Sequence, residues 1–134
     1  MNTTEVFERF RADQYATAVT GIEIIDVRED YAKTKLVVGP QHLNALGMMQ
    51  GGALFTLADF TFAVATNAGY EESTVAIECT ISFLKPVTDG VLYAESEEVF
   101  KTRSLKALDV TITDGRGEIV AKFHGRGFVR HSSK

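Results

Sequence analysis

An apolar segment, residues 51–69, constrains the fold of this chain more than any other feature. It contains one charged residue, Asp59, among Ala, Leu, Phe and Val. A helix formed by this segment is expected to be buried nearly all round. A membrane span is the alternative, but polar residues interrupt the segment and no other segment is comparably apolar. The sequence therefore predicts one buried helix in a protein without a membrane partner.

Asp59 is the residue in this segment that calls for an explanation. It could hydrogen-bond a neighbouring group and only help to pack the helix, or it could be a carboxylate tuned by desolvation for catalysis. Gln50, Gly51 and Gly52 stand where the helix should begin. The glycines could simply form a turn, but the first turn of a helix has free N–H groups that can hold a developing oxyanion, and glycine lets a ligand come close. This combination favours the catalytic interpretation.

The spacing of Gly51 and Asp59 predicts an oligomer. Eight residues of helix separate two groups by roughly 12 Å, whereas an acid and an oxyanion donor must both lie within about 3 Å of the reacting group. If both act in one site, that site needs two copies of the helix. We therefore predict a dimer in which Gly51 of one chain faces Asp59 of the other.

The remaining pattern predicts an α+β fold. Residues 3–18 have apolar positions at helical spacing, including Val6, Phe10 and Tyr15. Strands are expected at 21–27, 32–38, 74–84, 91–101, 104–113 and 118–130. Six residues of the last two strands are expected to point inward: Leu108, Val110, Ile112, Ile119, Ala121 and Phe123. Short turns between the late strands favour an antiparallel sheet that wraps round the apolar helix.

Composition limits the class of protein. The 134 residues suit a single domain spanning 1–134. A net charge of −4 and an isoelectric point near 5.3 argue against nucleic acid as the main partner. The single cysteine, Cys79, and a polar N-terminus without a signal-peptide core favour the cytoplasm. The three histidines form no metal-ligand spacing, so we expect no metal, and Cys79 is interpreted as a packed core residue.

A resemblance makes the function specific. The motif pieces are His42-Leu43-Asn44, Gly47, Gln50-Gly51-Gly52, Leu57-Ala58-Asp59 and Phe62-Ala63, followed by residues 79–86 and 125–127. Together they resemble the hotdog-fold acyl-CoA thioesterases, in particular the PaaI-like, phenylacetate-pathway branch of the 4-hydroxybenzoyl-CoA thioesterase superfamily. The resemblance implies an antiparallel sheet of about five to six strands around one long helix. It also implies hydrolysis of an acyl-CoA to free acid and CoA in homodimers with shared sites, with CoA as part of the substrate and no cofactor. A dimer of dimers is expected, although the sequence does not decide between dimer and tetramer.

The resemblance also implies roles for individual residues. Asp59 is the nucleophile or the general base, the Gly51 amide polarises the thioester carbonyl, and Asn44 orders the catalytic loop, although Asn44 could equally be a loop cap. Gln50 departs from the family, which commonly has His there. Because Gln does not titrate near neutral pH, Gln50 cannot be the general base, and we expect it to orient substrate or loop.

The CoA nucleotide is expected to meet a basic rim. Two groups of polar and basic residues on the late strands could pair with its phosphates, or could be ordinary solvated faces: Lys101, Arg103, Ser104, Lys106, Lys122, His124, Arg126 and Arg130. From these we select Arg103, Ser104 and Arg126, with Gly52 contacting substrate. Five apolar residues could line an acyl pocket, although core or interface is favoured for most of them: Met48, Met49, Phe55, Phe60 and Phe62.

Two other classes stay open at this point. A hydratase or dehydratase on the same fold is disfavoured because no suitable His lies near Asp59 in the sequence. A non-catalytic acyl-CoA-binding protein would keep Gly51 and the basic rim and would need no reactive acid. The acyl group itself, whether aromatic, short or medium in length, does not follow from the sequence.

Overall fold

Six antiparallel strands and one long helix make up the body of the molecule in the computed structural model, which describes residues 2–131. The predicted domain of 1–134 thus includes Met1 and residues 132–134, which lie outside the described residues. The strand order is β1-β2-β4-β5-β6-β3. The strands are β1 Glu23–Arg28, β2 Tyr31–Val37, β3 Ser73–Phe83, β4 Val91–Lys101, β5 Leu105–Thr113 and β6 Ile119–Arg130. The predicted α+β hotdog architecture is confirmed.

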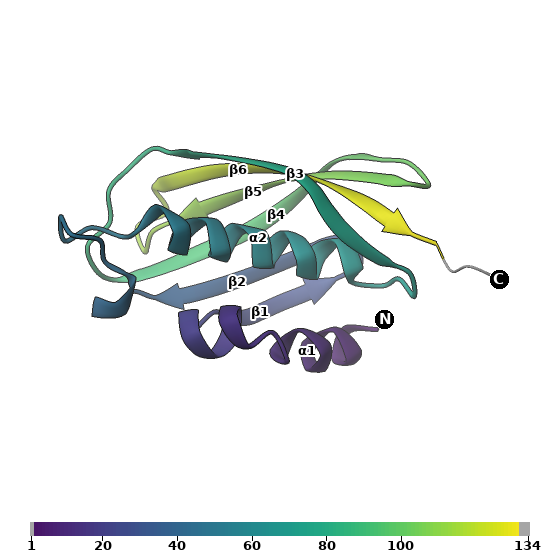
Figure 1. Cartoon of the computed structure of the whole chain (residues 1–134), viewed down its shortest axis with the longest axis horizontal. Helices are drawn as coiled ribbons and strands as arrows, with labels where there is room; N and C mark the ends of the chain where they lie inside the picture. The colour runs from purple at the N-terminus through teal and green to yellow at the C-terminus, as the bar shows by residue number, and fades with distance from the viewer. Residues whose placement is uncertain (1, 132–134) are drawn as a thin grey trace.

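Helix α2, Gly51–Asn67, lies across one face of this sheet and contacts all six strands (Figure 1). Its large side chains fill the core: Leu57 and Phe62 are almost completely buried. Gly125 on β6 allows this close approach, because a Cβ there would come within 2.9 Å of the Phe62 ring. The prediction that α2 is buried nearly all round is wrong, however. One strip of the helix, centred on Asp59, stays half-exposed in the single chain.

The N-terminal helix is shorter than predicted. Helix α1, Thr3–Arg11, buries Val6 and places Phe10 edge-on against Phe60 of α2 at 6.1 Å between ring centroids. The helix ends there, because the Asp13 side chain accepts a hydrogen bond from Ala16 N–H at 3.1 Å and starts a separate π-helical turn, Tyr15–Thr20. Tyr15 therefore points to solvent, with 64% of its surface exposed, and is not part of the core face.

Two irregularities in the sheet redirect side chains that simple alternation assigns inward. Between β5 and β6 the register shifts after Ile112, so Ile119 pairs with Thr113 and is 46% exposed, while Val120 is buried. The other five predicted inward residues of these strands are buried, as expected. In β3 a bulge at Ile77 shifts the alternation: Cys79, Ile81 and Phe83 face α2, whereas residue 75 pairs with Phe128 on the outer face.

Two hydrogen bonds hold the C-terminal end of α2 against the sheet. The Asn67 side chain accepts a hydrogen bond from Thr74 N–H at 2.9 Å, near the start of β3. The Lys106 ammonium, buried under the helix, donates to the carbonyl oxygen of Thr66 at 2.7 Å. Lys106 therefore caps the C-terminal end of α2, where a cation opposes the negative end of the helix dipole. The prediction that Lys106 could belong to an exposed basic rim is wrong.

Candidate functional site

The start of α2 has two backbone N–H groups without an acceptor among the described residues, and one of the two residues, Gly51, lines a pocket. Gln50 is the N-cap residue, and its side-chain oxygen accepts a hydrogen bond from Ala53 N–H at 3.2 Å. Gly51 N–H and Gly52 N–H meet no acceptor among residues 2–131. These two donors, at the positive end of the helix dipole, can hold a negatively charged oxygen. Gln50 thus orders the helix start, while its contact with substrate remains a prediction.

The loop before α2 is held by Asn44. The Asn44 side-chain oxygen accepts hydrogen bonds from Leu46 N–H at 2.9 Å and from Met48 N–H at 3.1 Å. The buried His42 ring accepts from Gly39 N–H through Nδ1 at 2.9 Å and lies 2.6 Å from the Thr20 carbonyl oxygen through Nε2. Both residues therefore have structural work in the loop, which agrees with the loop-cap interpretation of Asn44. Neither His42 nitrogen is left for proton transfer.

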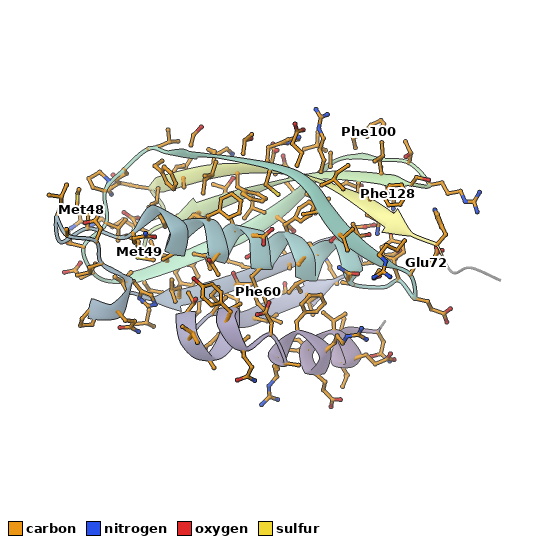
Figure 2. The ribbon with its side chains drawn as sticks, viewed as in Figure 1. Met48, Met49, Phe60, Glu72, Phe100 and Phe128 are labelled. Carbon is orange, nitrogen blue, oxygen red and sulfur yellow. The ribbon has the colours of Figure 1, made fainter. Side chains whose placement is uncertain are left out.

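A pocket of about 340 Å³ opens beside Gly51. Its walls come from the motif loop, the first turns of α2, the end of β3 and the segment after it, and they are mainly apolar, with Asn44 and Lys85 as the polar residues. The Phe83 ring stands over the helix start, 3.1 Å from where a Cβ on Gly51 would lie. Of the five residues predicted for an acyl pocket, Met48 and Met49 line it, and Figure 2 shows them at this end of the molecule.

The other three predicted acyl-pocket residues lie elsewhere. Phe60 and Phe62 are buried in the core, and the Phe55 ring packs edge-on against Phe123 at 5.5 Å between centroids. Phe83 lines the pocket but was not predicted to do so from the sequence, where it appears only within the 79–86 motif.

Asp59 lies at the centre of the half-exposed strip of α2. Burial raises the pKa of its carboxyl above the usual value, and the Asp13 carboxylate raises it further. No described residue donates a hydrogen bond to the Asp59 side chain. A carboxylate that serves to hold a helix in place accepts hydrogen bonds from protein donors, whereas the half-exposed Asp59 carboxylate accepts none from the described residues. The contacts therefore do not support the packing interpretation of Asp59.

Gly51 and Asp59 are not brought together within one chain. Both belong to the continuous helix α2, so roughly 12 Å of helix separates them. Helix α2 runs antiparallel to β3: Gly51 lies beside Phe83, and Asp59 is close enough to Cys79 to raise the pKa of its thiol. Burial is the larger cause and, with the carboxylates of Asp59 and Glu78, raises the pKa of Cys79 to about 11. A thiol of this kind is a poor nucleophile at neutral pH.

The predicted nucleotide-binding residues lie at the other end of the sheet. Arg103 and Ser104 form the turn between β4 and β5, and Arg126 lies on the outer face of β6, 3.7 Å from Glu78. Arg126 and His124 line a pocket of about 280 Å³ with the exposed Phe100 ring. Phe100 and Phe128 lie far from Met48 and Met49 (Figure 2). Phe100 was missed from the sequence because the bulge in β4 turns it outward.

The sequence predicted neither a metal site nor a membrane span, and the described part of the chain can be searched for both. No group of three or more His, Cys, Asp or Glu residues among 2–131 is arranged to hold a metal ion. Within the same range, no helix combines the length and the apolar character that crossing a bilayer requires.

Comparisons with known proteins agree with this geometry. The sequence profile of the Thioesterase superfamily matches residues 46–121, which include both Gly51 and Asp59. The acyl-coenzyme A thioesterase PaaI of Escherichia coli (strain K12) is 36% identical over 107 residues, covering 79% of this chain and 76% of that protein. A putative esterase of Archaeoglobus fulgidus is 42% identical over 77 residues, which is 57% of this chain and 49% of that protein. The match thus spans about half the length of that relative.

Solved structures show the same fold. The PaaI protein of the Escherichia coli phenylacetic acid degradation operon superposes with a TM-score of 0.84 at 28% identity, covering 96% of each chain. A hypothetical thioesterase of Streptococcus pneumoniae TIGR4, solved with coenzyme A, gives a TM-score of 0.82 at 26% identity and covers 96% of this chain and 99% of that one.

Proposed function

This chain belongs to the thioesterase superfamily, a family of thioester hydrolases, and we propose that it cleaves acyl-CoA with Asp59 and the Gly51 amide. The observation that carries the proposal is that two polar groups on α2 both lack a hydrogen-bond partner among the described residues. Within the part of the chain that the structure describes, Gly51 N–H has no acceptor at a helix start beside a largely apolar pocket, and the Asp59 carboxylate has no donor. Each group lacks the partner that a thioester and a water molecule would supply.

In the proposed reaction the thioester carbonyl oxygen accepts a hydrogen bond from Gly51 N–H. Asp59 either attacks the carbonyl carbon or takes a proton from an attacking water. The negative charge that develops on the oxygen is stabilised by the amide and the helix dipole. When water attacks, the proton that Asp59 has taken passes to the sulfur as the C–S bond breaks, and CoA leaves as the thiol and the acyl group as a carboxylic acid. When Asp59 attacks, breaking of the C–S bond leaves an anhydride between Asp59 and the acyl group, and the departing sulfur takes a proton from water. Water then hydrolyses the anhydride, which releases the carboxylic acid and restores the Asp59 carboxylate. Gln50 takes no proton in this scheme, because its amide does not titrate.

We propose that two copies of the chain build each site. Strand β3 is an edge strand of 11 residues, and no described strand pairs with its outer side. A long unpaired edge is a template for a second strand. An antiparallel pair of β3 strands would bring two α2 helices side by side. The half-exposed strip around Asp59 would then be covered by the partner.

The contacts between α2 and β3 predict the register of this pair. Asp59 is level with Cys79 and Gly51 is level with Phe83. For Asp59 to meet the partner's Gly51, residue 79 must lie opposite residue 83 of the second strand. The two-fold axis then passes close to Ile81, midway between them. Arg126, which pairs with Glu78, would also come level with the partner's Gly51, on the outer face of the sheet.

This arrangement suits the length of a CoA thioester. The nucleotide would bind at Arg103, Ser104 and Arg126, where the two guanidinium groups would pair with phosphates and the Ser104 hydroxyl would hydrogen-bond them. Gly52, with its free N–H, would contact the thioester end beside Gly51. The bound CoA in the Streptococcus pneumoniae thioesterase supports a CoA site on this fold. We propose CoA as part of the substrate, with no separate cofactor and no metal.

Two further elements complete the proposal. The outer sheet face exposes Val99, Phe100, Leu105 and Phe128, which a second dimer would cover to give a tetramer. The cytoplasm remains the proposed compartment because Cys79 is a free thiol. A hydratase would need a histidine beside the acid, and both nitrogens of the neighbouring loop histidine, His42, are engaged.

The test is thiol release from a panel of acyl-CoAs, comparing wild type with Asp59→Asn. We expect steady release by the wild type and a fall in kcat of about 100- to 10,000-fold in the variant, with KM little changed. The variant should unfold at an equal or higher temperature at pH 7, because it no longer carries an unpaired charge. Equal turnover by the two proteins contradicts the role of Asp59. Binding of CoA without any hydrolysis points instead to an acyl-CoA-binding protein.

A further inference from the structure

The pocket beside Gly51 contains one charged side chain, Lys85, in an otherwise uncharged wall. Its other walls include Met48, Leu54 and Phe83. An acyl group whose carbonyl oxygen accepts from Gly51 N–H has this pocket as its nearest apolar space. At about 340 Å³ the volume is at the small end for ligand pockets. It suits an aromatic ring or a medium alkyl chain and is too small for the whole of CoA.

Lys85 is already neutralised by the protein. Its ammonium lies 2.6 Å from Asp114 Oδ2 and also donates to Glu118 Oε1. Asp114 is itself held in the β5–β6 turn, where its other oxygen accepts from Arg116 N–H at 2.9 Å and from Glu118 N–H at 3.0 Å. The Lys85 ammonium thus contacts two carboxylates, of which Asp114 is held in place by the turn. The pocket therefore offers no free positive charge to an acyl group that ends in a carboxylate.

Phe83 controls the entrance between this pocket and the amide. The β3 register turns its ring towards α2, and the end of the ring lies 3.1 Å from the Cβ position of Gly51. The ring is 54% exposed, so the rest of the protein does not bury it. An acyl chain that extends from the thioester carbonyl carbon into the pocket must pass this ring.

We propose that the pocket selects uncharged, apolar acyl groups, with Phe83 setting the size that passes and the Asp114–Lys85–Glu118 contacts excluding dicarboxylic acyl groups. The proposal rests on the proposed thioesterase function and adds the substrate class. Phe83 and Lys85 are specificity residues, and neither takes part in bond breaking.

The first experiment compares two six-carbon substrates, hexanoyl-CoA and adipoyl-CoA, which differ by one terminal carboxylate. We expect kcat/KM for hexanoyl-CoA to exceed that for adipoyl-CoA by about 100-fold, since an unpaired charge would enter an apolar pocket. Asp114→Asn with Glu118→Gln releases Lys85 and should narrow this ratio at least about tenfold by improving the adipoyl reaction. Adding Lys85→Met should restore the wild-type ratio. A wild type without preference, or a ratio that does not respond to release of Lys85, overturns the proposal.

The second experiment tests Phe83 with a matched control. Phe83→Ala should shift the preferred acyl length or bulk, measured as the kcat/KM ratio of decanoyl-CoA to butanoyl-CoA, by about tenfold. Tyr15→Ala removes an exposed aromatic ring, 64% of its surface exposed, from the N-terminal π-helical turn, outside the pocket and the proposed interfaces, and should leave that ratio unchanged. Equal shifts in both variants, or none in Phe83→Ala, contradict the assignment. Circular dichroism and the unfolding temperature confirm that each variant is folded.

A third measurement separates this proposal from the proposed function. If no acyl-CoA is hydrolysed, the thioesterase proposal fails, and the pocket is then tested by calorimetry with hexanoate and adipate. Selective binding of hexanoate, lost in Phe83→Ala, supports the pocket assignment on its own. Binding of adipate as tight as that of hexanoate, or binding of neither, rejects it.

Discussion

At the scale of single residues, the proposed site depends on two groups that meet no partner among residues 2–131. Gly51 donates its N–H to no acceptor in that range, and Asp59 accepts no hydrogen bond from it. The sequence identified both residues, because one acid in an apolar segment and a glycine pair at a helix start are local features. Phe83 and the contacts of Lys85 escaped prediction. The carboxylates that hold Lys85 lie 29 and 33 residues away, and only the fold brings them close.

Gly51→Pro tests the amide directly. Residue 51 is the first residue of α2, where proline fits the helix, and Gln50 has the extended backbone that proline requires of its predecessor. The substitution thus removes the N–H and keeps the helix. We expect kcat to fall about 100- to 1000-fold. Gly51→Ala retains the N–H and needs only a small shift of the Phe83 ring, so it should lose much less. Equal losses in the two variants would show that the N–H is not the cause.

The raised pKa of Asp59 predicts where activity falls in acid. The reaction needs the ionised carboxylate, so the acid limb of kcat/KM should lie above pH 3.8, the ordinary value for Asp. Asp13→Asn removes a negative charge that raises this pKa, and Asn can still accept the bond from Ala16 N–H. The limb should therefore move to lower pH in Asp13→Asn and stay in place in Glu8→Gln, on the surface of α1. A limb that does not move, or moves upward, contradicts the assignment.

At the scale of elements, periodicity predicted the type of every long strand and of α2, and it failed where the backbone departs from regularity. The Ile77 bulge and the register shift before Ile119 reverse which face of the sheet the neighbouring residues occupy. The alternation of apolar and polar residues in the sequence does not reveal either irregularity. Asp13 ends the N-terminal helix early through a local hydrogen bond. Strand β3 is also the element on which the proposed assembly depends.

A cysteine at position 81 tests the register of β3. If the two-fold axis passes at Ile81, the two copies of this residue lie opposite each other at about 4.5–5.5 Å between Cα atoms, within disulfide range. In a Cys79→Ser background, Ile81→Cys should form a covalent dimer under mild oxidation. Glu78→Cys, on the same strand and more exposed, should remain monomeric on a non-reducing gel. Cross-linking at 78 and not at 81 would require another register.

At the scale of the whole molecule, the two groups proposed to act on the thioester, the Gly51 amide and the Asp59 carboxylate, lie at different points along α2. One chain holds an amide donor beside an apolar pocket at one end of its helix and an acid two turns further on. The basic residues proposed for the nucleotide lie on the outer face of β6 and in the turn between β4 and β5, and none of them lines that pocket. A two-fold axis at β3 brings all three together in each of two sites. The prediction of a dimer from the sequence came from this separation, and the unpaired β3 edge indicates how the dimer would form.

Complementation between two inactive variants tests this shared site most directly. Gly51→Pro and Asp59→Asn are co-expressed with different affinity tags, and the heterodimer is purified through both tags. One of its two sites carries both substitutions and the other carries neither, so we predict about half of the wild-type kcat. Each parent homodimer carries one lesion in every site and should remain inactive. A heterodimer no more active than its parents would show that Gly51 and Asp59 act within the same chain, or do not act together at all.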